Sequence, residues 1–199
     1  MFSFLIISGA ATFLLIVFLL HFLKREIEPS WRMISEYEIG RFGWLMRLAF
    51  ICLSISCAAL LATTHAYLSP INELFLGVAA FGLWGAAIYA TDPITTPREA
   101  MSGTSRLHAV FGVLFIFGFP VAAALITWNS IFPLSNSFRL LVSVMSVLVW
   151  LGLIAFMVST AVYGRSKEAS GPGVKIGWPN RVMMLINVAW LLVAGFAFR

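Results

Sequence analysis

The polar residues that could do chemistry are few, and they stand at the edges of long apolar stretches. Asp92 closes one such stretch and His108 opens the next, so a helical hairpin would return both to the same end of a bundle. Glu36 and Tyr37 precede the second stretch, and Arg181 opens the last. Ionisable side chains at the edge of a hydrocarbon region are costly unless they are paired or hydrated, which makes such a cluster a candidate functional site.

Two kinds of chemistry fit these residue types. Glu36, Asp92 and His108 could hold a divalent metal ion that activates water, or could act as catalytic acid and base groups. Alternatively, Arg181 and a protonated His108 could bind a lipid phosphate, with Asp92 orienting the imidazole and Tyr37 adding a hydrogen bond. The second hypothesis needs fewer assumptions, because no HxxxH or CxxC pair supplies two metal ligands from one helix. The predicted ligand-binding residues are therefore Tyr37, Asp92, His108 and Arg181.

Resident cofactors are not predicted. A haem held across a membrane needs two histidines at equal depth on facing helices, and only His21 and His108 could meet that condition. His21 precedes a Lys-Arg pair, with two residues between them, at a helix end where its ring is expected to reach the interface, so haem is disfavoured. The sequence contains no GxSxG elbow, phosphate loop or dinucleotide fingerprint.

The composition identifies the solvent that surrounds these residues. Of the 199 residues, 61% are apolar and only 11% are charged, and the mean hydropathy is +0.97. Soluble domains carry roughly 25% charged residues. A water-soluble fold and a disordered chain are therefore both excluded, and most of the surface must face lipid.

Six apolar stretches are long enough to cross a bilayer as α-helices, which requires about 20 residues each. A β-barrel is excluded because none of them alternates between apolar and polar residues. The sequence predicts an all-α polytopic membrane protein, a single domain formed by one bundle of six transmembrane helices. A short interfacial helix is expected over Pro29–Ile39. The predicted spans are residues 2–23, 48–67, 74–90, 107–128, 140–163 and 182–198.

Small residues indicate where helices approach each other. In the second span Ser54, Ala58 and Ala62 recur every four residues, and the third span carries Gly82 and Ala86. Such stripes let backbones come close in lipid, where packing replaces the hydrophobic effect. We expect both stripes to be packing faces.

The distribution of Lys and Arg predicts the orientation in the membrane, since these residues concentrate on the cytoplasmic side. Eleven of the thirteen fall in three of the loops or at their edges, so both termini are expected outside and the candidate cluster inside. No basic run is dense enough to indicate nucleic-acid binding. The eleven are Lys24, Arg25, Arg32, Arg41, Arg47, Arg98, Arg106, Arg165, Lys167, Lys175 and Arg181.

Short motifs along the chain resemble a known family. The run Ser35–Met46 resembles the opening motif of the DUF998 family of six-helix bacterial and archaeal membrane proteins. Tyr89–Pro93 is similar to its FPTDP segment, Leu107–Ala109 to its Leu-His step, and Gly177–Arg181 to the motif before its last helix.

The resemblance implies a cytoplasmic membrane protein of a bacterium or archaeon, and it implicates Tyr37, Asp92, His108 and Arg181. The chain departs from the family pattern at Ala90, where the family has proline, and at the Pro179-Asn180 pair. The family has no assigned function, so it adds no reaction.

We therefore expect a protein that binds a lipid headgroup or a partner at an inner polar pocket. Membrane lipids, a second copy or a larger membrane complex are the expected partners. A metal-assisted hydrolase of lipids is the alternative. A small transporter is disfavoured, because no span carries an acidic residue near its middle and no internal repeat is evident.

Overall fold

The computed structural model of the chain is built from long helices joined by loops. It describes residues 2–129, 131–132, 134–163 and 173–198. Arg165 and Lys167, which contributed to the predicted orientation, lie outside these residues. The long helices are α1 (Phe2–Leu23), α2 (Gly43–Thr64), α3 (Pro70–Ile88), α4 (Gly103–Asn129), α5 (Asn136–Tyr163) and α6 (Gly177–Ala197).

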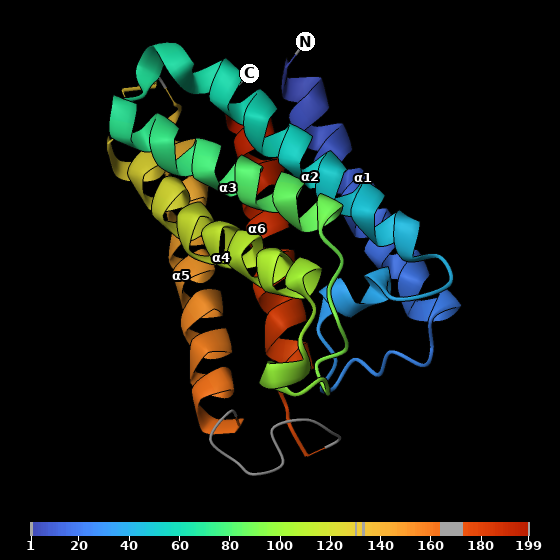
Figure 1. Ribbon diagram of the computed structural model, residues 1–199. Helices are drawn as coiled ribbons and strands as arrows, with labels where there is room; N and C mark the ends of the chain where they lie inside the picture. Colours follow the sequence, from blue (N-terminus) through green and yellow to red (C-terminus); the bar gives the residue numbers. More distant parts are fainter. Residues whose placement is uncertain (1, 130, 133, 164–172, 199) are drawn as a thin grey trace.

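The helices form the expected six-span bundle (Figure 1). Both termini lie at one end. The opposite end, called the loop end from here on, holds residues 24–42, 89–102 and 173–176. Each of the six helices is long and apolar enough to cross a membrane. The sequence prediction of an all-helical membrane protein is confirmed in the part of the chain that the structure describes.

Five helices begin four or five residues before the predicted spans, at Gly43, Pro70, Gly103, Asn136 and Gly177. The predicted spans were drawn so that they contained no charged residue, whereas the first turns of these helices do contain charged residues. Arg47 and Arg181 are examples, since both lie within the first turns of their helices. A long cationic side chain can reach the membrane edge from inside a helix end.

The expected interfacial helix is shorter and more buried than predicted. Only Ile34–Glu38 is helical, as a single 3₁₀ turn called η1, and its Ile34, Glu36, Tyr37 and Glu38 are buried. Lys24 is itself buried and donates from Nζ to the carbonyl oxygens of Tyr37, at 3.0 Å, and of Ile39. The segment therefore packs onto the ends of the helices instead of lying on the membrane surface.

The packing faces agree with the sequence only in part. An added Cβ at Gly82 would lie 2.7 Å from the backbone of Phe111 and of Phe115, so α3 and α4 approach closely there. On α2, however, Ala58 and Ala62 are exposed. The buried face of α2 runs instead through Leu53, Ser56, Cys57 and Leu60.

Candidate functional site

The first turn of α6 places the Arg181 side chain beneath the segment that connects α1 to α2. The residue is only 7% exposed. Its Nη1 donates to three backbone carbonyls, those of Pro29, Arg32 and Gly177. The guanidinium therefore holds the connecting segment to the start of α6.

Two side chains complete the surroundings of the guanidinium. Nη2 donates to the Tyr37 hydroxyl at 3.1 Å, and Nε donates to Nε2 of His21, also at 3.1 Å. The Tyr37 ring lies near both groups: the Arg181 Cζ is 5.5 Å from its centroid, and the centroid of the His21 ring is 5.3 Å from it at a tilt of 57°. The structure thus joins Arg181 to Tyr37, as the sequence grouped them, and adds His21.

These contacts determine the tautomer of His21. Its Nδ1 lies 2.7 Å from the carbonyl oxygen of Val17, which can only accept, so Nδ1 carries the hydrogen. Nε2 then accepts from Arg181 and the imidazole is neutral. The charge at this position therefore belongs to Arg181 alone.

No carboxylate among the described residues pairs with Arg181, since every acceptor that it contacts is neutral. A buried charge is normally paired with an opposite charge or bound to a ligand. The cluster thus presents an uncompensated positive charge at the edge of the membrane-spanning region.

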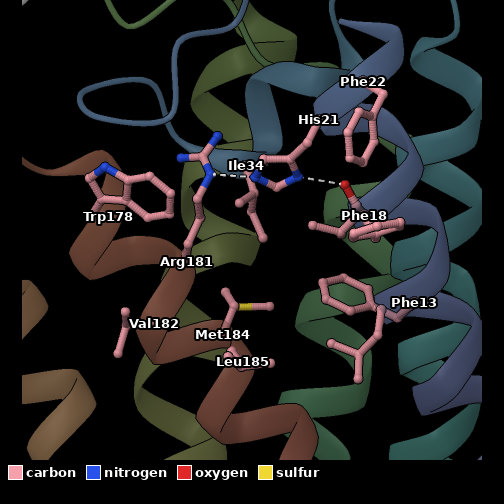
Figure 2. A pocket seen from close by; sticks show the side chains of 12 residues that line it. Phe13, Phe18, His21, Phe22, Ile34, Trp178, Arg181, Val182, Met184 and Leu185 are labelled. Carbon is pink, nitrogen blue, oxygen red and sulfur yellow. Dashed lines mark hydrogen bonds between the residues drawn. The ribbon is translucent and has the colours of Figure 1, made fainter. Parts of the chain in front are cut away.

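An apolar cavity of about 560 Å³ opens beside this cluster, between α1 and α6. Figure 2 shows Arg181 and His21 facing each other across its head, with Phe13, Met184 and Leu185 further along. The cavity lining is almost wholly hydrocarbon apart from these two polar groups. The cavity is therefore polar at one end and apolar elsewhere.

The other predicted site residues lie elsewhere on the loop end. The Asp92 carboxylate accepts from the backbone N–H of Ser102 at 2.7 Å and from its hydroxyl at 3.1 Å. Glu36 pairs with Arg32 at 2.8 Å and accepts from the N–H of Ile94. Both carboxylates therefore hold loops in place.

The partner of His108 differs from the expected one. No hydrogen bond or ion pair joins it to Asp92 among the described residues. Its Nδ1 lies 2.7 Å from the carbonyl oxygen of Tyr89, and the acid beside it is Glu38, with Oε2 3.5 Å from Nδ1. Glu38 also pairs with Arg47 at 2.8 Å. Burial raises the pKa of the Glu38 carboxyl to about 7, although Arg47 opposes the shift.

Glu36 and Asp92 line one small pocket of about 200 Å³, whereas His108 lines another cavity of about 330 Å³. Of the described residues, no three His, Cys, Asp or Glu side chains are grouped so that they could hold a metal ion. The described residues therefore offer no set of ligands that would support the metal hypothesis.

Three residues of this region were not predicted as site residues: His21, which was considered only as a haem ligand, Glu38, and Asn180, whose Oδ1 accepts from the N–H of Ile34. Glu38 lies in the same predicted segment as Glu36, and η1 buries both acids, whereas a regular α-helix would place residues two apart on different faces. His21 reaches Arg181 because the first and last helices pack together, a contact that no local sequence pattern indicates.

Comparison with known families supports the resemblance in the motifs. The family described as "Protein of unknown function (DUF998)" matches residues 7–197, which is nearly the whole chain. Neither the curated proteins nor the solved structures yielded a match to the chain. With its six membrane-spanning helices and this match, the chain belongs to the DUF998 family.

Proposed function

We propose that this membrane protein binds an anionic lipid between α1 and α6, with the lipid headgroup at Arg181 and one acyl chain along the apolar cavity. The observation that supports the proposal is the buried guanidinium without a carboxylate partner among the described residues, at the head of a cavity of about 560 Å³. An anion there would compensate the charge in a region of low dielectric constant.

One hydrogen of the guanidinium has no acceptor among the described residues. Three acceptors share the two hydrogens of Nη1, whereas Nη2 carries two hydrogens and donates to the Tyr37 hydroxyl. The second Nη2 hydrogen remains for a phosphate or carboxylate oxygen. Trp178 also lines the cavity, and its ring suits the headgroup region of a bilayer.

We also propose that the loop end faces the cytoplasm and that the membrane is the cytoplasmic membrane of a bacterium or archaeon. Arg25, Arg41 and Arg98 are exposed at this end, where they would meet the anionic lipids of the inner leaflet. Lipid binding would suit an accessory protein of a larger membrane assembly, or a protein that acts as a homo-oligomer. Lipid hydrolysis and transport stay predictions from the sequence.

The test is to purify the protein in nanodiscs that contain phosphatidylglycerol and phosphatidylcholine, and to identify retained lipid by native mass spectrometry. We expect wild type to retain phosphatidylglycerol in preference to phosphatidylcholine. Arg181→Ala should lose this preference. Because Arg181 also holds backbone carbonyls, a second variant, Leu14→Trp, fills the cavity and leaves the guanidinium in place.

A matched control is available on the same helix. Leu15 is 58% exposed and does not line the cavity, so Leu15→Trp should retain phosphatidylglycerol as wild type does. Equal retention by wild type, Leu14→Trp and Arg181→Ala would overturn the proposal. Loss in Leu15→Trp as well would show that the preference arises from the general lipid surface.

A further inference from the structure

A second cavity, called the His108 cavity, lies on the other side of α6. Its volume is about 330 Å³. Figure 1 shows the end of α4 close to the start of α5, and the two helices diverge toward the loop end. Residues of both helices line the cavity, including Val113 and Phe117, which are exposed on the outer face of α4. The cavity is therefore open to lipid between α4 and α5.

One end of this cavity carries a hydrogen-bond acceptor. His108 is 7% exposed, and its Nδ1 lies 2.7 Å from the carbonyl oxygen of Tyr89. A carbonyl can only accept, so Nδ1 carries the hydrogen and the lone pair of the neutral ring is on Nε2. The backbone of Ala86 also contacts the ring, but its carbonyl can only accept, so no described residue donates to Nε2.

The same cavity also carries a donor. Asn180 is 5% exposed, and its Oδ1 accepts from the backbone N–H of Ile34 at 3.1 Å. This bond fixes the orientation of the amide, because a backbone N–H can only donate. The Nδ2 group has no partner among the described residues and remains a donor.

The charges around the cavity select against ions. Its polar lining consists of the neutral groups Ser35, Thr91, His108 and Asn180, and no Lys or Arg contributes to it. The nearest acid is Glu38, 3.5 Å from the His108 ring, and it is paired with Arg47. An anion would meet no cation here, whereas a hydroxyl can donate to one nitrogen and accept from the other.

We propose that the His108 cavity binds an uncharged lipid that carries a hydroxyl group, of the class of long-chain alcohols and diacylglycerols. The hydroxyl lies between His108 Nε2 and Asn180 Nδ2, and the chain leaves between α4 and α5. This site is separate from the one at Arg181. It takes a different class of ligand, so either proposal can fail alone.

The experiment uses a photoactivatable long-chain alcohol and its methyl ether, which has the same chain and no donor hydrogen. Each probe is added to the full-length protein in nanodiscs, irradiated and mapped by mass spectrometry. We expect the alcohol to label α4 and α5 roughly tenfold more than the ether. Losing one hydrogen bond to a buried group weakens binding by about this factor.

Two glycines give a matched pair of variants. An added Cβ at Gly112, which lines the cavity, or at Gly77, which does not, meets nothing within 4 Å. Gly112→Leu should abolish labelling by filling the cavity, whereas Gly77→Leu should leave it unchanged. His108→Phe should remove the preference for the alcohol over the ether.

Equal labelling by alcohol and ether in wild type would overturn hydroxyl recognition. Unchanged labelling in Gly112→Leu would place the bound lipid elsewhere and overturn the cavity assignment. A thermal unfolding midpoint of the Gly112→Leu sample close to that of wild type shows that the variant is folded. Retention of phosphatidylglycerol, measured separately on this sample, keeps the two sites distinguishable.

Discussion

Glu38 is a buried acid at the loop end. Its carboxyl group is buried against Arg47, His108 and the N–H of Thr91, and burial raises its pKa to about 7 from the usual 4.5. The folded protein thus holds a proton that the unfolded chain releases between these two values. The free energy of unfolding should therefore fall as the pH rises through this window.

This sign predicts how Glu38→Gln compares with wild type. The amide does not titrate, so wild type should lose stability relative to Glu38→Gln as the pH rises from below 4.5 to above 7. The slope is at most about 1.4 kcal/mol per pH unit for one group. Thermal unfolding in one detergent over this pH range measures it.

An exposed acid gives the control for this comparison. Glu99 is exposed in the loop between α3 and α4, so the difference between wild type and Glu99→Gln should stay flat with pH. A flat difference for Glu38→Gln as well would mean that the Glu38 carboxyl titrates as it does in water.

The residue scale also shows what the sequence could not predict. The sequence placed Tyr37 and Arg181 at one end of the bundle, and the structure joins them at 3.1 Å. It could not show that the buried acid facing His108 is Glu38 instead of Asp92. That choice depends on how η1 packs on the helix ends, which no local pattern specifies.

At the scale of elements, the helices were predictable because lipid imposes one strong requirement. A span must be long, apolar and internally hydrogen-bonded, and six stretches met that requirement. The residues at which the helices start were not predictable, because charged residues are allowed in a first turn that reaches the membrane edge. The packing faces of the helices were predicted correctly only where a glycine permits close contact, as at Gly82.

The contact of α3 with α4 gives a prediction about packing. A methyl group added at Gly82 would lie 2.7 Å from backbone atoms of Phe111 and Phe115, so one helix must shift. Overpacking of this kind costs roughly 1–3 kcal/mol. Gly82→Ala should therefore lower the midpoint of thermal unfolding.

Gly77 on the same helix is the control, because an added Cβ there meets nothing within 4 Å. Gly77→Ala should unfold at or slightly above the wild-type midpoint, since alanine favours the helix over glycine. If Gly82→Ala unfolded together with Gly77→Ala, the two helices would be further apart than the structure places them.

At the scale of the whole molecule, the cavities form a series through the loop end. Ile34 and Met184 line both the α1–α6 cavity and the His108 cavity. Ser35 and Thr91 line both the His108 cavity and the polar pocket of Glu36 and Asp92. Glu36, Asp92, His108 and Arg181 therefore line neighbouring pockets, and η1 contributes residues to all three.

Which lipids can reach these cavities depends on the side of the membrane that the loop end faces. Arg98 is exposed at the loop end, and His65 is exposed at the opposite end. In intact cells, a membrane-impermeant maleimide should label His65→Cys but should label Arg98→Cys only after permeabilisation. The native Cys52 and Cys57 lie within α2, so the unmodified chain serves as the background. Labelling of Arg98→Cys in intact cells would place the Arg181 cluster outside and remove the inner-leaflet lipids as its ligands.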